Sequence, residues 1–589
     1  MIGVEPRRGR EMASRILLIW IVLSMLQIVV NGAAIWQLRF PDPDDTLRLV
    51  EVRDWLAGQG WFDVHQYRID AADGGAPMHW SRLVDLPLAA VILLFKPLFG
   101  QAVAEVAALI LVPLLTLGCV LVLIGRIAWK LFDEEIAGLA CLACAVAVPL
   151  VHQLRPMRID HHGWQIVAML IAVNGLMARD ARRGGWAIGA SLAVWLAISI
   201  EGLPLAACFI AVLALRWLRN RADRGWLVHA MLALATCSAA LFMVTRGAGD
   251  LAQHCDAIAP VHLVVFAWGA SAIAVLAWFE PSPRAVTLGG LALTGAGALL
   301  IVRWLVPQCA GGAFVELDPL VRAFWYERVL EGQPLWKDSV SVLVQSLGLP
   351  ALGLYATWRL LGRSGGWLKQ WWIEYFVLSL VAFVIALLVA RAAAAACALA
   401  AVPLGWQLRE WIRIARNSRA PKRRALVLAG VTLALAPALP LSLLLLASPS
   451  HAALAKARAV RVSTCKIDAA VPSLRRLPPS TILAPLDIGP RLIYATPHGV
   501  IATGHHRAAA AMHEVIEAFT SDAAVARAIV RRRGIAYVAL CPDLVEPMTY
   551  AKAAPHGFAA LLRDDRAPDW LEPVPMPGDG SFRLWRVVG

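Results

Sequence analysis

The sequence predicts a polytopic α-helical membrane protein that ends in an extracytoplasmic α/β domain. Of its 589 residues, 59% are hydrophobic and only 16% are charged, and the mean hydropathy is +0.64. A soluble domain normally carries about 25% charged residues. Apolar segments of about 16 to 24 residues recur as far as residue 447, and each can cross roughly 30 Å of hydrocarbon as a helix. The remainder, 451–589, has no such segment and is interrupted by Pro and Gly.

The apolar segments predict about thirteen spanning helices. We expect them at residues 16–36, 102–125, 136–153, 163–178, 186–200, 203–218, 228–245, 261–279, 286–306, 338–361, 371–390, 392–408 and 424–447. The segment Val84–Phe99 is shorter, and Lys96-Pro97 interrupts its end. Counting it as a span would reverse the charge bias of the later loops, so we interpret it as a re-entrant or interfacial helix.

The basic residues predict the orientation, because cytoplasmic loops carry an excess of Lys and Arg. The net charge of +14 is distributed over short clusters between the apolar segments. That pattern argues for membrane topology and against a nucleic-acid partner. The clusters lie at residues 7–10, 126–130, 179–183, 216–224 and 409–424. We therefore expect a multi-pass protein of the cell inner membrane, with the N-terminus in the cytoplasm and the C-terminal domain in the periplasm or another extracytoplasmic space.

The sequence thus predicts two domains, a membrane domain at 1–450 and a soluble α/β domain at 451–589. In the soluble domain, 481–486, 491–496, 499–503 and 535–541 have the composition of strands, and 505–530 that of a helix. Cys465 and Cys541 both fall in this domain, on the oxidising side of the membrane. A disulfide between them is plausible, but the sequence alone leaves the pairing open.

Three external loops, 37–83, 154–163 and 307–337, carry the polar residues that could do chemistry. In the first, Asp42, Asp44 and Asp45 stand just before a helix expected to begin near Thr46. Capping of that helix explains one aspartate well. Three like charges in one turn repel each other unless a cation or several donors neutralise them, so a cation site is the competing interpretation.

The second loop is short and contains Asp160-His161-His162, flanked by Arg155 and Arg158. A carboxylate with an imidazole is a usable ligand set for Mn²⁺ or Mg²⁺, and Arg suits phosphate oxygens. In the third loop, Glu331 stands where the chain turns back toward the bilayer. From this stretch alone, a solvated loop acid is the simpler interpretation of Glu331.

These motifs, in this order, resemble the catalytic subunit of oligosaccharyltransferases, integral membrane glycosyltransferases of the C-type (GT-C) fold. The family's first motif often has the form D-P-x-x-x-L-R, and residues 42–48 here are DPDDTLR. Archaeal members carry D-H-H in the second motif, as at 160–162. A loop motif similar to S-V-S-E-x-Q-P corresponds to RVLEGQP at 328–334. The resemblance implies about thirteen spans and an outer soluble domain, as expected above.

The acceptor-reading motif of the family departs most from its usual form. W-W-D-Y-G is replaced by PLDIG at 485–489, which retains the Asp and the Gly and lacks both Trp and the Tyr. In the family those aromatic residues help to hold the hydroxyl of the acceptor Ser or Thr. The resemblance therefore implies glycosyl transfer but a weakened preference for Asn-x-Ser/Thr peptides.

The resemblance also implies how the donor is held. A polyprenyl (pyro)phosphate would leave the anomeric carbon of a sugar as an acceptor attacks, and its charge would be stabilised by a divalent metal and Arg. The implied cofactor is Mn²⁺ or Mg²⁺, with Asp42, or instead Asp44 or Asp45, as a ligand together with Asp160 and His162; Glu331 is a further candidate ligand. Arg155 and Arg158 are the implied phosphate-binding residues.

For the acceptor, the resemblance implies carboxylates that orient or deprotonate the nucleophile. The implied catalytic residues are Asp42, Asp44, Asp45 and Glu331, and the implied acceptor-binding residues are Glu331 and Asp487. The acceptor is a protein, a glycan or a lipid, and the lipid tail of the donor would lie among membrane lipids along the spans.

Two other functions compete with this one. The first is a transferase that moves a single sugar from polyprenyl phosphate to a lipid or a polysaccharide. The second is a transporter, whose coupling residues should lie near the bilayer midplane on broken helices. Glu201, between two spans, is the residue that favours a transporter, whereas the acidic clusters in external loops favour an enzyme.

Overall fold

The chain folds into two compact units. The computed structural model describes residues 6–312, 314–315, 317–437, 439, 465–578 and 580–588. Unit 1 comprises Met1–Arg39, Ser81–Ala313 and Leu330–Leu444, and unit 2 comprises Phe40–Trp80, Phe314–Val329 and Leu445–Gly589. The expected soluble domain, 451–589, thus falls in unit 2, which also contains 40–80 and 314–329 from two of the predicted external loops.

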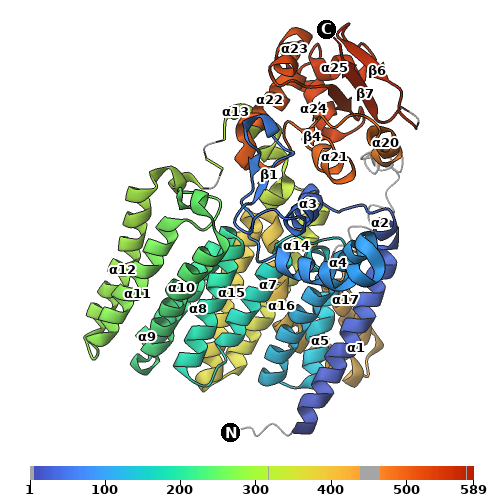
Figure 1. Cartoon of the computed structure of the whole chain (residues 1–589). Coiled ribbons are helices and arrows are strands. Elements are labelled where there is room, and N and C mark those ends of the chain that lie inside the picture. Colours follow the sequence, from blue (N-terminus) through green and yellow to red (C-terminus); the bar gives the residue numbers. More distant parts are fainter. Residues whose placement is uncertain are drawn as a thin grey trace. The chain divides into compact units, whose positions relative to one another are not determined.

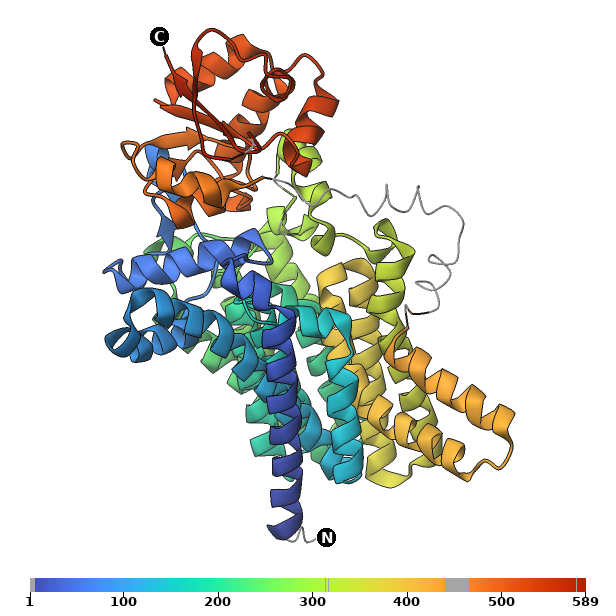
Figure 2. The same cartoon turned by 90° about the vertical axis from the view of Figure 1, so that its right-hand side faces the viewer.

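Unit 1 is helical, and its long helices run side by side as a bundle (Figures 1 and 2). The helices before the second loop are α1 (Pro6–Val30), α2 (Gly32–Trp36), α4 (Asp85–Leu131), α5 (Glu134–Ala145) and α6 (Val148–Gln153). Those that follow are α7 (His162–Gly175), α8 (Ala181–Ile198), α9 (Leu203–Arg219), α10 (Arg224–Thr245), α11 (Pro260–Trp278) and α12 (Arg284–Leu305). After the third loop come α14 (Val340–Arg363), α15 (Gly366–Leu388), α16 (Ala393–Asn417) and α17 (Pro421–Leu435).

The multi-span helical fold expected from the sequence is confirmed. Among the described residues, nine helices are long and apolar enough to cross a membrane. The expected spans at 136–153, 163–178 and 186–200 also fold as helices. However, α5 and α7 have only 12 and 14 residues, and α8 carries Arg182 and Arg183 in its first turn. The last expected span, 424–447, begins within α17 and continues beyond the described residues.

The segment Val84–Phe99 forms the first part of α4 and is separated from the rest by a kink. Gly100 lies at the kink with φ 78° and ψ 170°, a conformation that side chains with a Cβ rarely adopt. In Figures 1 and 2 this first part runs across the bundle near α2, whereas the remainder of α4 runs along it. That direction is the one expected of an interfacial helix rather than of a span.

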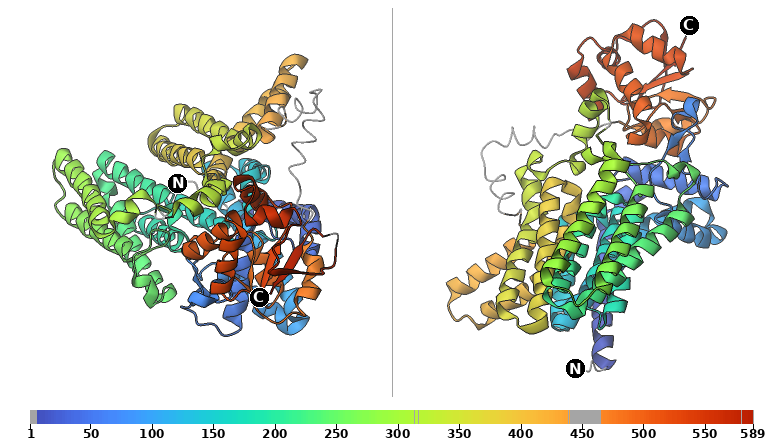
Figure 3. Two further views of the ribbon diagram at one scale, coloured as in Figure 1. Left: turned by 90° about the horizontal axis from the view of Figure 1, so that it is seen from above. Right: turned by 90° about the vertical axis from the view of Figure 1, so that its left-hand side faces the viewer.

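The bundle combines tight helix contacts with faces that expose apolar side chains. A Cβ added at Gly189 of α8 would lie 2.1 Å from the carbonyl oxygen of Ala230 in α10, so this contact depends on glycine. The pair α11 and α12 lies at one edge of the bundle (Figure 3), and Leu293 and Leu299 of α12 are 71% and 74% exposed. Such apolar exposure is typical of a surface in contact with lipid tails.

Unit 2 contains a five-stranded sheet in the order β4-β3-β5-β7-β6. The strands are β3 (Thr481–Leu483), β4 (Gly499–Val500), β5 (Tyr537–Leu540), β6 (Leu571–Val574) and β7 (Arg583–Val587). Strand β3 is parallel to β4 and β5, whereas β7 is antiparallel to β5 and β6. Two further short strands, β1 (His65–Gln66) and β2 (Ala76–Pro77), pair antiparallel.

The helices of unit 2 complete an α/β domain. They are α3 (Pro43–Leu56), α13 (Pro319–Phe324), α20 (Ile467–Leu474), α21 (Gly489–Ala495), α22 (Ala509–Thr520), α23 (Ala523–Arg532), α24 (Val545–Ala553) and α25 (Phe558–Arg563). The predicted helix at 505–530 is two helices, because Asp522 caps a new one, α23, with its carboxylate.

The strand predicted at 491–496 is wrong, since these residues belong to α21 and its end. Pro490 opens this helix, where its missing N–H costs no hydrogen bond. Leu492, Ile493 and Ala495 are buried, which is a helical rather than an alternating pattern. The strands predicted at 481–486, 499–503 and 535–541 are present as β3, β4 and β5.

Two disulfides join distant parts of the chain. Cys465 and Cys541, the pairing left open by the sequence, are bonded within unit 2. Cys255 and Cys309 are bonded within unit 1, between the loop that follows α10 and the turn that follows α12. Both loops are extracytoplasmic in the expected topology, which agrees with the oxidising chemistry of that side.

Candidate active site

The loop between α6 and α7 carries a cluster of buried polar residues in unit 1. Met157, in this loop, adopts a left-handed backbone conformation with φ 72° and donates its N–H to the Leu109 carbonyl of α4 at 2.8 Å. Its side chain is buried. Such strained positions persist only where the surrounding structure holds them. The anchored loop fixes the residues from Arg158 to His162 at the start of α7.

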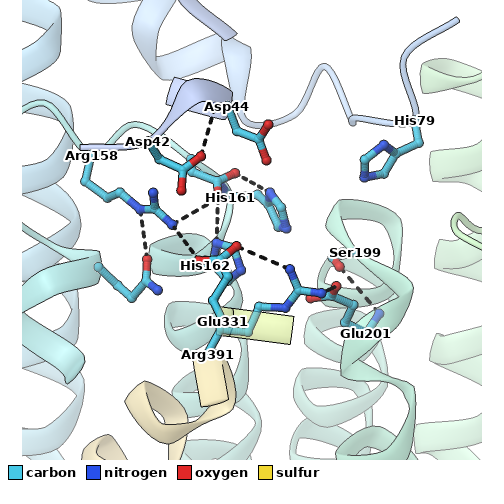
Figure 4. Close-up of polar contacts among 12 residues, drawn as sticks. Asp42, Asp44, His79, Arg158, His161, His162, Ser199, Glu201, Glu331 and Arg391 are labelled. Atoms are coloured by element: carbon cyan, nitrogen blue, oxygen red, sulfur yellow. Dashed lines mark hydrogen bonds and ion pairs between the residues drawn. The ribbon is translucent and has the colours of Figure 1, made fainter. Parts of the chain in front are cut away.

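Asp160 sits at the centre of this cluster, 6% exposed. Its Oδ2 lies 2.6 Å from Nδ1 of His162, and its Oδ1 accepts the backbone N–H of His161 at 2.6 Å and also pairs with the His161 ring. The two imidazole rings stack with centroids 4.4 Å apart. One carboxylate thus orients two imidazoles, and Figure 4 shows His161 and His162 near Arg158.

The charges of this cluster stabilise one another. Burial alone would raise the pKa of Asp160, but the two neighbouring imidazoles hold it well below its usual range. Burial alone would lower the pKa of His162, but the Asp160 carboxylate raises it. Asp160 is therefore ionised at neutral pH, and His162 is held with its Nδ1 toward the carboxylate.

The outer nitrogen of His162 provides a test of the predicted metal site. His162 is 8% exposed, and its Nε2 is buried without a hydrogen-bond partner. A buried polar atom without a partner is costly, whereas a histidine that donates Nδ1–H to a carboxylate and offers Nε2 is a common metal ligand. Asp160, His161 and His162 also offer ligand atoms within 4.8 Å of one another. The residues present therefore fit a divalent cation.

Arginine and glutamate side chains extend the cluster on one side. Arg158, 3% exposed, lies 3.6 Å from Oδ2 of Asp160 and 3.7 Å from Oε2 of Glu331, and its Nε donates to Gln153 at 3.1 Å. Arg391 lies 3.5 Å from Oε1 of Glu331. Glu331 is thus held between two guanidinium groups and is only one-third exposed, so it is not a freely solvated loop acid.

The backbone holds Glu331 and Arg391 next to each other. Glu331 lies in a short 3₁₀ turn, Leu330–Gly332, and Arg391 lies in another, Ala390–Ala392, between α15 and α16. The N–H of Ala390 donates to the carbonyl of Gln333 at 3.0 Å, which ties the two turns together. Arg391 also pairs with Glu201, which lies in the 3₁₀ turn Ile200–Gly202 just before α9. Glu201 therefore belongs to the same cluster, and the transporter interpretation loses the residue that favoured it.

The structure brings together some of the predicted site residues and distributes others. Arg158, Asp160, His162 and Glu331 form one cluster in unit 1. Arg155, also in unit 1, donates to His152 at 3.1 Å. The remaining predicted residues, Asp42, Asp44, Asp45 and Asp487, belong to unit 2.

Within unit 2, the aspartates after the first span lie at the N-terminus of α3. Asp42 is the N-cap of α3, and its side chain accepts the N–H of Asp44 at 2.9 Å. Asp44 and Asp45 lie in the first turn, where negative charge interacts favourably with the helix dipole, and Asp45 is fully buried. Capping thus accounts for Asp42, as the simpler interpretation of this motif expected.

Asp487 lies in the turn that precedes α21, and a glutamate from α24 holds this turn. Oε1 of Glu546 accepts the N–H of Leu486 at 2.7 Å, and Oε2 accepts that of Asp487 at 2.9 Å. The hydroxyl of Tyr550 donates to the same carboxylate at 2.5 Å. Burial and the negative charge of Asp487 raise the pKa of Glu546 to about 8. The turn 485–489 is therefore fixed through its backbone.

Arg391 and Gln153 belong to the cluster but are not among the residues predicted from the sequence. Arg391 stands alone in an alanine-rich stretch between two predicted spans. A signal was present, since an arginine at the expected outer end of spans runs against the positive-inside bias. Gln153 gave no comparable signal, because its role depends on the path of the loop after α6.

Comparison with solved structures identifies the fold. The oligosaccharyltransferase AglB of the archaeon Archaeoglobus fulgidus, in complex with an inhibitory peptide and a dolichol-phosphate, superposes with a TM-score of 0.64 at 14% identity, covering 95% of this chain and 72% of that one. The same organism's enzyme tethered to an acceptor peptide with the NVT sequon gives 0.62 at 15% identity, covering 98% and 74%. Its complex with Zn and sulfate gives 0.59 at 14%, covering 97% and 73%.

Comparisons by sequence give no match. No protein-family model matches the chain, and no curated protein does. The chain therefore has the fold of the archaeal oligosaccharyltransferase, a multi-span helical membrane protein with a C-terminal soluble domain. The sequence identity of 14% is too low to assign the function from the fold alone. The resemblance inferred from short motifs is confirmed at the level of the fold.

Proposed function

We propose that the protein is a membrane glycosyltransferase that moves a sugar or an oligosaccharide from a polyprenyl-(pyro)phosphate donor to an acceptor. The observation that supports this most directly is the buried imidazole of His162, which is oriented by Asp160 and leaves Nε2 without a partner next to Arg158. Solved structures of the same fold are described with a dolichol-phosphate and with an acceptor peptide. Both the site and the fold thus suit a lipid-phosphate donor.

In this proposal, the arginines act on the departing phosphate. As the bond from the anomeric carbon to the phosphate oxygen breaks, negative charge grows on the phosphate. Arg158 and Arg391 supply positive charge from two separate parts of the chain, and Glu331 holds both guanidinium groups in place. Arg155, the other predicted phosphate-binding residue, lies three residues before Arg158 on the same loop. Because these groups are fixed before reaction, they stabilise the transition state without reorganisation.

Asp160 and His162 would hold the divalent cation, Mn²⁺ or Mg²⁺. When bound, the cation supplies Lewis-acid stabilisation of the leaving phosphate. Asp160 keeps His162 in the orientation in which Nε2 points away from the carboxylate. Asp42 as a third ligand, the catalytic roles of Asp44 and Asp45, and acceptor binding by Glu331 and Asp487 stay predictions from the motif resemblance.

The proposed location follows from the expected topology. The protein would lie in the cell inner membrane, with the cluster around Asp160 and the soluble domain on the periplasmic or extracytoplasmic side. The lipid tail of the donor would then lie along the spans, among membrane lipids. This arrangement would place the sugar at the membrane surface, where an acceptor from outside the cytoplasm could reach it.

One observation favours a second candidate, a single-sugar transferase acting on a glycan or a lipid. Pro485, Leu486 and Ile488 replace the aromatic residues of W-W-D-Y-G, and they offer neither an indole N–H nor a phenol O–H. An unmet buried hydroxyl costs about 1–3 kcal/mol, which corresponds to about 5- to 150-fold in selectivity. We therefore expect a weak preference or none for Asn-x-Thr over Asn-x-Ala peptides.

The experiment combines both questions in one assay. Purified full-length protein is incubated with a polyprenyl-linked donor, Mn²⁺, and either matched Thr and Ala peptides or a cell-envelope glycan and lipid extract. Mass spectrometry then measures sugar transfer to each acceptor and release of polyprenyl phosphate. No metal-dependent release with any acceptor would contradict the proposed function. Strong transfer to the Thr peptide alone would instead contradict only the second candidate and support a peptide N-oligosaccharyltransferase.

A further inference from the structure

Unit 2 contains a pocket whose charged side chains are three arginines. The pocket has a volume of about 430 Å³, and it lies at the C-terminal end of α21. Its lining residues are Arg53, Arg68, Arg475, Ile493, Tyr494, Ala495, Thr496 and Pro497. The arginines come from α3, from the segment after β1 and from the end of α20, so the fold assembles them from three separate parts of the chain. No carboxylate is among these lining residues.

Each arginine is held in position by a carbonyl group at the end of α21. Arg68 donates to the carbonyl oxygens of residues 493 and 496, at 2.7 and 3.1 Å. Arg475 donates through Nε to the carbonyl of residue 495 at 2.7 Å. Arg53 donates to the carbonyl of Tyr494 at 3.1 Å, and its guanidinium lies over the Tyr494 ring at 4.4 Å. The three guanidinium groups are therefore preorganised rather than free to rotate in solvent.

Capping of α21 alone does not require this much positive charge. The end of a helix carries roughly half an elementary negative charge, and one basic side chain is enough to complement it. Three guanidinium groups are crowded here instead. The pKa of Arg68 is lowered by burial and by the charge of Arg53, against the opposing effect of Asp54. An anion in the pocket would relieve this repulsion.

We propose that this pocket binds the phosphate group of a small ligand, separately from the donor site in unit 1. The planar guanidinium fork matches phosphate oxygens, and several such groups around one point favour a doubly charged oxyanion over a single carboxylate. The volume falls within the range of small-molecule sites. Helix α21 has seven residues and begins two residues after Asp487, so the pocket lies about 10 Å along the helix from the turn 485–489.

The test is binding of pyrophosphate to the full-length protein in detergent with a chelator present, measured by calorimetry. We expect saturable binding that weakens about tenfold in Arg475→Gln. Arg476→Gln is the matched control, because Arg476 is adjacent and exposed but does not line the pocket. The thermal midpoint without ligand reports whether either change disturbs the fold. Equal affinities of the two variants, or no saturable binding by the unmodified protein, would overturn the proposal.

A second measurement uses the unmodified protein, so it does not depend on the folding of any variant. Phenylglyoxal labels arginine side chains, and mass spectrometry maps the labelled positions. We expect pyrophosphate and a sugar 1-phosphate to slow labelling of Arg475 and Arg68 several-fold, with Arg476 unchanged. Equal protection by glucuronate at the same concentration would overturn the assignment to phosphate. If none of these anions changes the labelling rate of Arg475 or Arg68, the pocket is not a ligand site.

Discussion

Replacing Asp160 with Asn tests the proposed metal site with a change of almost no volume. The carboxylate lies 2.6 Å from His162 and 3.6 Å from Arg158, and Asn removes its charge while leaving an oxygen of similar position. At an effective dielectric constant of about 20, a pair of unit charges 3.6 Å apart attracts by about 5 kcal/mol before desolvation is counted. Glu331 still neutralises Arg158 in the variant. We therefore expect the variant to fold.

The expected effect on metal binding depends on the role of Asp160. Loss of the carboxylate that orients a ligating histidine typically weakens metal affinity by about 10- to 100-fold, which is about 1.4–2.7 kcal/mol. If Asp160 only orients His162, raising the Mn²⁺ concentration should restore transfer. If Asp160 is itself a metal ligand, its loss should weaken Mn²⁺ binding further, and excess Mn²⁺ should restore little transfer. His162→Ala removes Nε2 itself and should abolish transfer at any Mn²⁺ concentration.

The assay measures release of polyprenyl phosphate from the donor across a series of Mn²⁺ concentrations after chelation. Asp180→Asn is the matched control, since Asp180 caps α8 through its Oδ1 and Asn caps helices equally well. The control should keep the full rate and the unchanged Mn²⁺ requirement. Full activity of Asp160→Asn and His162→Ala in the presence of chelator would refute the reasoning from the buried Nε2.

Three other predictions concern the arginine pair, the turn of unit 2 and the topology. Arg391→Gln should lower transfer about 10- to 100-fold, because it removes a guanidinium group held against Glu331. Arg363→Gln is the control and should not lower transfer, because Arg363 pairs with Glu410 instead. An unchanged kcat in both variants would contradict the phosphate-binding role of Arg391. Folding raises the pKa of Glu546 from 4.5 to about 8, so between these pH values the folded state keeps a proton that the unfolded chain loses. The free energy of unfolding should therefore fall as the pH rises through this range, by up to about 1.4 kcal/mol per pH unit. Thermal midpoints from pH 5 to pH 8 should show this fall in the unmodified protein and not in Glu546→Gln, and an identical slope in both would exclude Glu546 as its cause. Reporter fusions after residues 60, 160, 320 and 460 should all report the non-cytoplasmic side, and a cytoplasmic signal at any of them would separate the proposed site residues.

The multi-span fold could be predicted because the bilayer imposes it. A segment of about twenty apolar residues has few alternatives to a helix in hydrocarbon, since every backbone group must be bonded internally. The soluble domain has no such constraint, and there the prediction was weaker. Residues 491–496 carry β-branched and aromatic side chains in a strand-like order, yet Gly489 and Pro490 start a helix that buries Leu492 and Ile493. Tertiary burial prevailed over local propensity.

The candidate site could be predicted only where its residues are close in sequence. Asp160 and His162 are two positions apart, so their pairing at the start of α7 is local, and the sequence indicated it directly. Glu331 and Arg391 are sixty residues apart and meet through the hydrogen bond between their two turns. Such a contact depends on how α15 and α16 pack, which periodicity does not encode. The Cys255–Cys309 disulfide, between two loops separated by two helices, was missed for the same reason.

The backbone of the turn at 485–489 is held independently of the side chains that we propose to affect acceptor selectivity. Two N–H groups of this turn are bonded to Glu546, and Tyr550 donates to the same carboxylate, so the backbone is fixed without help from the side chains at positions 485, 486 and 488. A turn held in this way can lose its aromatic side chains and keep its path. In the proposed correspondence with W-W-D-Y-G, Asp487 then retains its place, while the side chains proposed to read a Ser or Thr hydroxyl are absent. The structure of the turn and its specificity are therefore separable, and a Trp pair introduced at 485 and 486 should restore peptide selectivity only if the rest of the acceptor site has been kept.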